Sequence, residues 1–172
     1  MNSYALLCLL AGVAVASALP AKPTCPEGWR VYQNSCYRTF LPEVNHTEAT
    51  ASCKEYGAHL VTISDEAENN FVGSMNINTP KRQDQFSNLY WIGLENLAIK
   101  KGSTNSFTGK FDWHWVDGTP FNYARWAEMS PRFYERCVLI DAGELSQWNG
   151  QWMTSPCNDF APRSYICEQS AQ

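Results

Sequence analysis

Seven cysteines stand in this chain of 172 residues, and they restrict its fold more than any other feature. Cys8 lies in a leader, where an apolar run precedes Ala16-Ser17-Ala18, a pattern typical of a cleaved signal peptide. Loss of the leader leaves an even number of cysteines, which in a secreted chain favours disulfides over metal ligation. Six cysteines can pair in many ways, so the residues alone leave the pairing open. The six are Cys25, Cys36, Cys53, Cys137, Cys157 and Cys167.

The leader also sets the expected compartment. Its apolar run, residues 6–15, is too short to cross a bilayer comfortably. An uncleaved membrane anchor is the alternative, and the good cleavage pattern weighs against it. We therefore expect a secreted, extracellular product without a membrane span. The expected divisions are a signal peptide at 1–18, a short flexible tail at 19–24, one domain at 25–169 and a C-terminal tail at 170–172.

The net charge argues against polyanionic partners, and the histidine spacing argues against a zinc site. The formal net charge is −4 at pH 7, and a mildly acidic chain does not attract polyanions as a whole. Nucleic acid and heparin are thus disfavoured as main partners. The three histidines, His46, His59 and His114, are isolated from one another and from any C-x-x-C pair, which argues against a zinc site.

Hydrophobic spacing predicts two short helices in the first half of the domain. Ala49, Cys53 and Tyr56 share one face of residues 47–56. A second helix is predicted to be capped by Ser64. Its first turn is acidic and its buried face is apolar: Asp65, Glu66, Glu68, Phe71 and Val72.

The remainder has the pattern of short strands separated by turns. Trp29 and Val31 alternate ahead of a turn at 33–35, which predicts a hairpin between Cys25 and Cys36. Further strands are expected at 59–63, 89–94, 111–115, 137–140 and 165–167, with polar loops at 73–88 and 98–110.

Several motifs occur in an order that is more specific than any one of them. They are C-x(10)-C, G-A-H-L-V-T-I, S-D-E-A-E-N-N-F-V, Y-W-I-G-L, W-x-W-x-D-G-T-P and Y-I-C-E. In this order the chain resembles the long form of the C-type lectin-like domain over residues 25–169. The resemblance implies an α+β fold, with two helices flanking two small antiparallel sheets and long loops on one side. It also implies the disulfides Cys25–Cys36, Cys53–Cys167 and Cys137–Cys157.

In calcium-dependent members of that family, a cation in the long loops also ligates two hydroxyls of the sugar. A Glu-Pro-Asn or Gln-Pro-Asp triplet, a carboxylate before the next cysteine and a Trp-Asn-Asp triplet supply its ligands. The triplets fall here on Ser130-Pro131-Arg132 and Trp152-Met153-Thr154, so Ser130, Arg132, Met153 and Thr154 depart from the pattern. Of the expected side-chain ligands, Glu135 alone remains, and a guanidinium repels a divalent cation. We expect no calcium bridge at this site and no required cofactor.

A structural calcium is a second possibility that the resemblance raises. Some members hold a cation with a backbone carbonyl and two glutamates, at positions that match Thr62, Glu68 and Glu168. The alternative is that Glu68 is a first-turn charge of a helix and Glu168 a solvated strand end. Two carboxylates brought together would repel unless something neutralises them.

Two further features bear on the surface. Asn45-His46-Thr47 is an acceptor sequence for N-glycosylation at Asn45. Trp148 lies in a polar turn near the region where the family binds its ligands. Together with Phe133 and Tyr134 it is predicted to form a calcium-free contact surface.

Two classes of function remain open. An enzyme is not expected, because catalytic motifs are missing and the disulfides take up the mature cysteines. The first class is a secreted module that recognises a glycan or glycoprotein through the long-loop face. The second is a calcium-independent protein-binding module of the same fold, with an immune, haemostatic or host-surface target. Without heptads or collagen repeats, a monomer or a domain-mediated dimer is expected.

Overall fold

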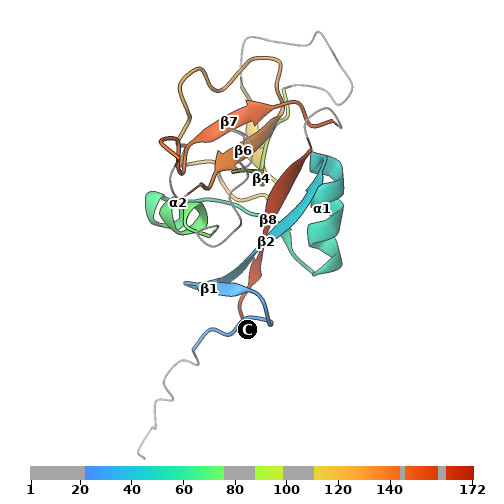
Figure 1. Ribbon diagram of the computed structural model, residues 1–172, viewed down its shortest axis with the longest axis vertical. Helices are drawn as coiled ribbons and strands as arrows, with labels where there is room; N and C mark the ends of the chain where they lie inside the picture. Colours follow the sequence, from blue (N-terminus) through green and yellow to red (C-terminus); the bar gives the residue numbers. More distant parts are fainter. Residues whose placement is uncertain (1–21, 76–87, 99–110, 144–145, 159–161) are drawn as a thin grey trace, which may run out of the picture.

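A computed structural model of the chain describes residues 22–75, 88–98, 111–143, 146–158 and 162–172. The described part is an α+β fold in which helices α1 (His46–Glu55) and α2 (Glu66–Gly73) flank a twisted sheet (Figure 1). The leader expected at 1–18 lies outside the described residues. The strands are β1 (Arg30–Tyr32), β2 (Ser35–Val44), β3 (His59–Leu60), β4 (Leu89–Asn96), β5 (Trp113–Trp115), β6 (Cys137–Asp141), β7 (Trp152–Ser155) and β8 (Arg163–Ser170).

The expected pair of small antiparallel sheets forms two parts of one connected sheet. The main path runs β1-β2-β8-β4-β6-β7, with β3 added to β8 and β5 added to β4. Strands β4 and β8 join the parts through a short parallel pairing, Tyr90 with Ser164 and Trp91 with Tyr165. Each of the other strand pairings is antiparallel.

Alternation along the central strands divides the core into two layers. Trp91 on β4 packs with Ala49 and Cys53 of α1, while its neighbour Ile92 packs with Val72 of α2. Successive side chains of a strand point to opposite faces, so a continuous apolar run such as β4 is buried on both sides. The sheet therefore lies between the two helices.

The three disulfides implied by the family resemblance are present: Cys25–Cys36, Cys53–Cys167 and Cys137–Cys157. The second joins α1 to β8 across a separation of 114 residues. On the chain-entropy model, such a link stabilises the fold by about 4 to 5 kcal/mol. The third joins the start of β6 to the chain just beyond β7 and so fixes that end of their hairpin.

Helix α1 begins one residue earlier than the predicted segment, and Asn45 caps it. The Asn45 side chain accepts the N–H of Glu48 at 2.9 Å, and the Glu48 side chain accepts the N–H of Asn45 at 3.3 Å. This reciprocal pair is a capping box, which satisfies two N–H groups that the helix leaves free.

The predicted cap of the second helix is wrong by one residue. Asp65, not Ser64, caps α2, since its Oδ1 accepts the N–H of Glu68 at 2.8 Å. A carboxylate is a stronger acceptor at a helix N-terminus than a hydroxyl. Ser64 instead donates its N–H and its hydroxyl to the Glu68 carboxylate, both at 2.7 Å.

The two ends of the described chain pair with each other. Thr24 and Gln172 exchange two backbone hydrogen bonds, at 2.9 and 3.0 Å, and Ala171 donates to the Asn34 carbonyl. Strand β8 continues to Ser170. Thr24 and the last residues of the chain are therefore held to each other and to the hairpin by backbone hydrogen bonds.

Candidate functional site

The expected sugar site lies where β6 begins and β7 ends, at the base of the loop that precedes β6. That loop is attached to the edge of the sheet by Trp126, which forms a parallel bridge with Trp152. Ala127 donates to the Trp152 carbonyl at 2.8 Å, and Ser130 donates to the Ala127 carbonyl at 3.1 Å. A cis peptide bond joins Ser130 to Pro131. These contacts attach the loop to Trp152, the first residue of β7.

A closed polar network occupies the position of the expected cation ligands. The Thr154 hydroxyl donates to Glu135 Oε2 at 2.6 Å and accepts the backbone N–H of Arg132 at 2.9 Å. Arg132 Nη1 lies 3.6 Å from the other oxygen, Glu135 Oε1. Glu135 is only 6% exposed. The Glu135 carboxylate is therefore buried and in contact with both Thr154 and Arg132.

The remaining candidates do not converge on Glu135. Met153 is half-buried and packs against the core layer on the α1 side. Adjacent strand residues point to opposite faces, so Met153 cannot join Thr154 in one site. The first residue of the same triplet, Trp152, is fully buried and donates its Nε1–H to Asn69 Oδ1 at 2.7 Å.

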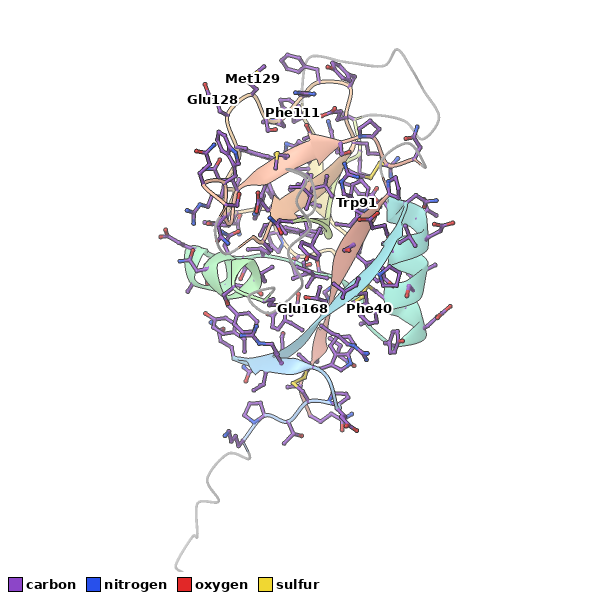
Figure 2. The ribbon with its side chains drawn as sticks, viewed as in Figure 1. Phe40, Trp91, Phe111, Glu128, Met129 and Glu168 are labelled. Atoms are coloured by element: carbon purple, nitrogen blue, oxygen red, sulfur yellow. A yellow bond between two sulfur atoms is a disulfide. The ribbon has the colours of Figure 1, made fainter. Side chains whose placement is uncertain are left out.

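Three large apolar side chains project from the same loop. Met129 is 78% exposed, Tyr134 72% and Phe133 54%. Figure 2 shows Met129 beside Glu128 at one end of the molecule, with Phe111 nearby. We call Met129, Phe133 and Tyr134 the apolar loop face. Exposed apolar side chains gathered in one loop are unusual for a surface that contacts water alone.

Two residues that shape this face carry no signal in the sequence. Phe111 stacks on Phe133, with ring centres 5.4 Å apart, and also on Trp113, at 5.5 Å. Met129 has a backbone φ of 66°, which a residue with a side chain seldom adopts. Neither residue lies in a motif, and no local sequence pattern predicts a left-handed backbone conformation at Met129.

The second candidate site lies in a cleft of about 210 Å³ between the β1–β2 hairpin, β8 and the start of α2. Tyr37 donates its hydroxyl to Glu68 Oε1 at 2.6 Å, while Ser64 donates twice to Oε2. Thr62 donates its N–H to Glu168 Oε2 at 3.1 Å. The structure therefore brings Thr62, Glu68 and Glu168 together, as the family resemblance implied, but hydrogen-bond donors already hold Glu68.

Ionisation in this cleft is perturbed by burial. Burial raises the pKa of Glu168 above its usual value, and the negative charge of Glu68 adds to the rise. The N–H of Thr62 and the hydroxyl of Ser35 act in the opposite direction. Burial also raises the pKa of Tyr37, so its hydroxyl stays protonated and donates to Glu68.

Comparison with known families now decides the identity of the fold. The family model described as the lectin C-type domain matches residues 43–169. The chain belongs to the C-type lectin domain family. A second model, described as UL45 protein, carbohydrate-binding C-type lectin-like, matches residues 3–77.

Individual C-type lectin domains are similar over most of the chain. Human C-type lectin domain family 4 member D is 34% identical over 148 residues, which are 84% of this chain and 58% of that protein. The C-type lectin domain of murine dendritic cell inhibitory receptor 2, solved in complex with N-glycan, is 30% identical. It aligns over 86% of this chain and 99% of the solved one, with a TM-score of 0.65.

A calcium-independent type II antifreeze protein has the same fold. It is 22% identical, aligns over 89% of this chain and 99% of its own, and has a TM-score of 0.67. C-type lectin domains are binding modules rather than enzymes, in agreement with the sequence prediction. Within the described part of the chain, neither helix is long and apolar enough to span a membrane.

In this C-type lectin domain, Trp148 does not join the apolar loop face. It lies in the turn that connects β6 to β7, whereas Glu135 and Thr154 lie at the opposite end of that hairpin. Asn149 ties the turn to α2 by donating to the Gly73 carbonyl at 3.2 Å. Trp148 is partly exposed, but it belongs to a separate surface.

One cluster of described side chains has the spacing of a metal site, but its atoms are already engaged in other interactions. His46, Glu95 and Cys137 offer atoms within 4.8 Å of one another. Cys137 is bound in a disulfide, and Arg136 pairs with Glu95 through two nitrogens. Burial lowers the pKa of His46, which remains neutral beside Trp91. The three residues are better explained as buried polar groups that already have partners than as a zinc site.

Proposed function

We propose that this chain is a secreted C-type lectin domain that recognises glycans through its long-loop face without a bridging calcium ion. The observation that carries the proposal is the closed network of Arg132, Glu135 and Thr154. A neutral hydroxyl and a permanent cation stand at positions where calcium-dependent members have ligands. The ligand class comes from the family, and the calcium independence comes from this network.

The small number of available oxygens argues against a cation at this site. Calcium takes about six to eight oxygen ligands, most of them from carboxylates, amides and carbonyls. Glu135 already accepts the Thr154 hydroxyl and faces Arg132, so a cation would have to displace both contacts. It would also enter beside a guanidinium that stays charged at any ordinary pH.

Two similar structures support the two parts of the proposal. The murine receptor domain was solved with an N-glycan, so glycan binding occurs among relatives of this similarity. The calcium-independent antifreeze protein is similar in fold alone and supports no ligand assignment. It indicates that the scaffold is compatible with calcium independence.

A glycan array run with calcium and with a chelator tests the proposal. We expect the same glycans to bind in both conditions, because no step of recognition uses the ion. Binding that disappears with the chelator would contradict calcium independence. The matched control is the murine receptor domain, whose N-glycan binding validates the array.

A protein ligand is the second candidate, and the apolar loop face favours it. Aromatic and Met side chains are enriched at protein interfaces, where they supply most of the binding free energy. Met129, Phe133 and Tyr134 present such side chains to solvent. Absence of glycan binding in either array condition would favour this function. Loss of partner binding in Phe133→Ala would then locate the contact.

The remaining expectations belong to the same proposal. The product is secreted after removal of residues 1–18 and carries an N-glycan at Asn45. It functions as a monomer or a domain-mediated dimer and requires no cofactor. Light scattering of the secreted protein distinguishes the two states. A structural calcium at Thr62, Glu68 and Glu168 is the alternative to cofactor independence, although Glu68 has both oxygens engaged.

A further inference from the structure

Met129 combines a largely exposed side chain with a left-handed backbone. It is the third residue of a four-residue turn that the N–H of Ser130 closes onto the carbonyl of Ala127 at 3.1 Å. Its φ is 66°, a value for which glycine is the usual residue because glycine has no Cβ. The turn therefore presents a thioether to solvent, where the Met129 side chain is 78% exposed.

The other methionines that the structure describes are packed against the core. Met75 follows α2 and packs against the core layer on that side of the sheet, while Met153 on β7 packs against the layer on the α1 side. Both are partly buried. Figure 2 shows Met129 clear of both helices, at one end of the molecule. Susceptibility to oxidation follows exposure, so Met129 is the most susceptible of these three residues.

Oxidation of this side chain needs a peroxide from outside the protein and no other group. The thioether sulfur attacks one oxygen of hydrogen peroxide, so an S–O bond forms while the O–O bond breaks. Sulfur loses two electrons and the peroxide gains them. The proton of the transferred oxygen passes to the leaving hydroxide, which departs as water. The product is methionine sulfoxide.

The sulfoxide changes the character of the apolar loop face. Met129 shares its loop with Phe133 and Tyr134, which are also exposed, and Phe133 stacks on Phe111 with ring centres 5.4 Å apart. Conversion of a flexible apolar side chain into a polar one disrupts surfaces that use Met for apolar contact. A sulfoxide at Met129 therefore adds a strong hydrogen-bond acceptor to an otherwise apolar set of side chains.

We propose that Met129 is the preferred oxidation site of the domain and that its conversion to the sulfoxide makes the apolar loop face more polar. Oxidation then weakens a protein contact made through this face, a consequence that rests on the second function proposed above. The modification site itself depends neither on that function nor on glycan binding.

Peptide mass spectrometry after timed exposure of the whole secreted domain to dilute hydrogen peroxide tests the site. We expect Met129 to gain an oxygen atom about tenfold faster than Met75 and Met153, because susceptibility follows exposure. In urea, with the disulfides intact, the three rates should become similar, since the fold no longer shields two of the side chains. Equal rates in the folded domain, or faster oxidation of Met75 or Met153, would overturn the assignment.

Retention on a phenyl hydrophobic-interaction column tests the change of the face. The oxidised wild type should elute earlier than the untreated protein. Met129→Leu, which keeps an apolar side chain without the sulfur, should show no shift after the same treatment. Met153→Leu is the matched control and should shift as the wild type does. Should Met129→Leu fail to fold, Met129→Gly, which suits the positive φ, provides the same comparison.

Two results on the column would overturn the second part of the proposal. One is an unchanged retention time for wild type in which mass spectrometry shows complete oxidation of Met129. The other is an equal shift in Met129→Leu, which would place the effect at a different residue. Neither readout uses calcium, a glycan or a protein partner, so failure of this proposal is distinguishable from failure of the proposed function.

Discussion

At the scale of single residues, two buried carboxylates of the domain accept hydrogen bonds from neighbouring side chains and backbone. Thr154 connects the loop to β7 by accepting from Arg132 and donating to Glu135. In the other cleft, Tyr37 and Ser64 hold Glu68 in the same manner. In both places a buried carboxylate is stabilised by donors of the chain itself.

Removal of the Thr154 hydroxyl should destabilise the domain. Thr154→Val leaves Glu135 buried without its nearest donor, at an expected cost of about 1 to 3 kcal/mol in the free energy of unfolding. Thr154→Ser keeps the hydroxyl and should retain most of the stability. Urea denaturation monitored by tryptophan fluorescence measures both variants. Equal stability of wild type and Thr154→Val would show that the network contributes nothing.

Glu168 should make stability depend on pH in the direction opposite to that of a paired carboxylate. Its pKa is raised in the folded state above its usual value of 4.5, so between these values the folded state binds more protons than the unfolded state. Stability therefore falls as pH rises through this window. The titratable groups around the Glu168 carboxylate are Glu68, Tyr37, His59 and Asp117.

Glu168→Gln consequently should raise the melting temperature at neutral pH in chelator. The difference from wild type should disappear below pH 4.5, where the glutamate is protonated in both states. Calorimetric melts across this range provide the measurement. A lower melting temperature for the variant at neutral pH would mean that the charged form of Glu168 is stabilising.

At the scale of elements, most of the architecture follows from the sequence, and the exceptions have local causes. Spacing of apolar residues located both helices, but Ser64 and Asp65 are both good caps, and only the fold decides which lies at the helix end. The parallel pairing of β4 with β8 joins segments far apart in the chain, which no local pattern reveals. Trp148 and Phe133 looked close because both flank β6, yet they lie at opposite ends of its hairpin.

The cap of α1 and the glycosylation site use the same residue, and variants can separate the two roles. Asn45→Ala removes both and should cost about 1 kcal/mol of stability through loss of the cap. Thr47→Ala removes the acceptor sequence but leaves the capping box intact. Both variants should lose the glycan, as measured by mass spectrometry of protein secreted from eukaryotic cells. Thermal melts of deglycosylated samples should show a loss for Asn45→Ala alone.

At the scale of the whole molecule, the family motifs supply the cysteines of the three disulfides and the apolar residues of the two-layer core. The departures that the sequence predicts from the calcium-dependent pattern fall in the loop before β6 and in β7. The sequence predicted that ligands are missing there, because residue types are visible without a structure. It did not show how Glu135 is compensated, since Arg132 and Thr154 are far apart along the chain.

Calorimetric titration of calcium into the wild type and Glu135→Ala tests the central claim most directly. Glu135 is the remaining side-chain ligand, so any ion in the long-loop site depends on it. We predict that the two proteins give the same titration, with no binding event that the substitution removes. Tight calcium binding in the wild type that Glu135→Ala abolishes would contradict the account.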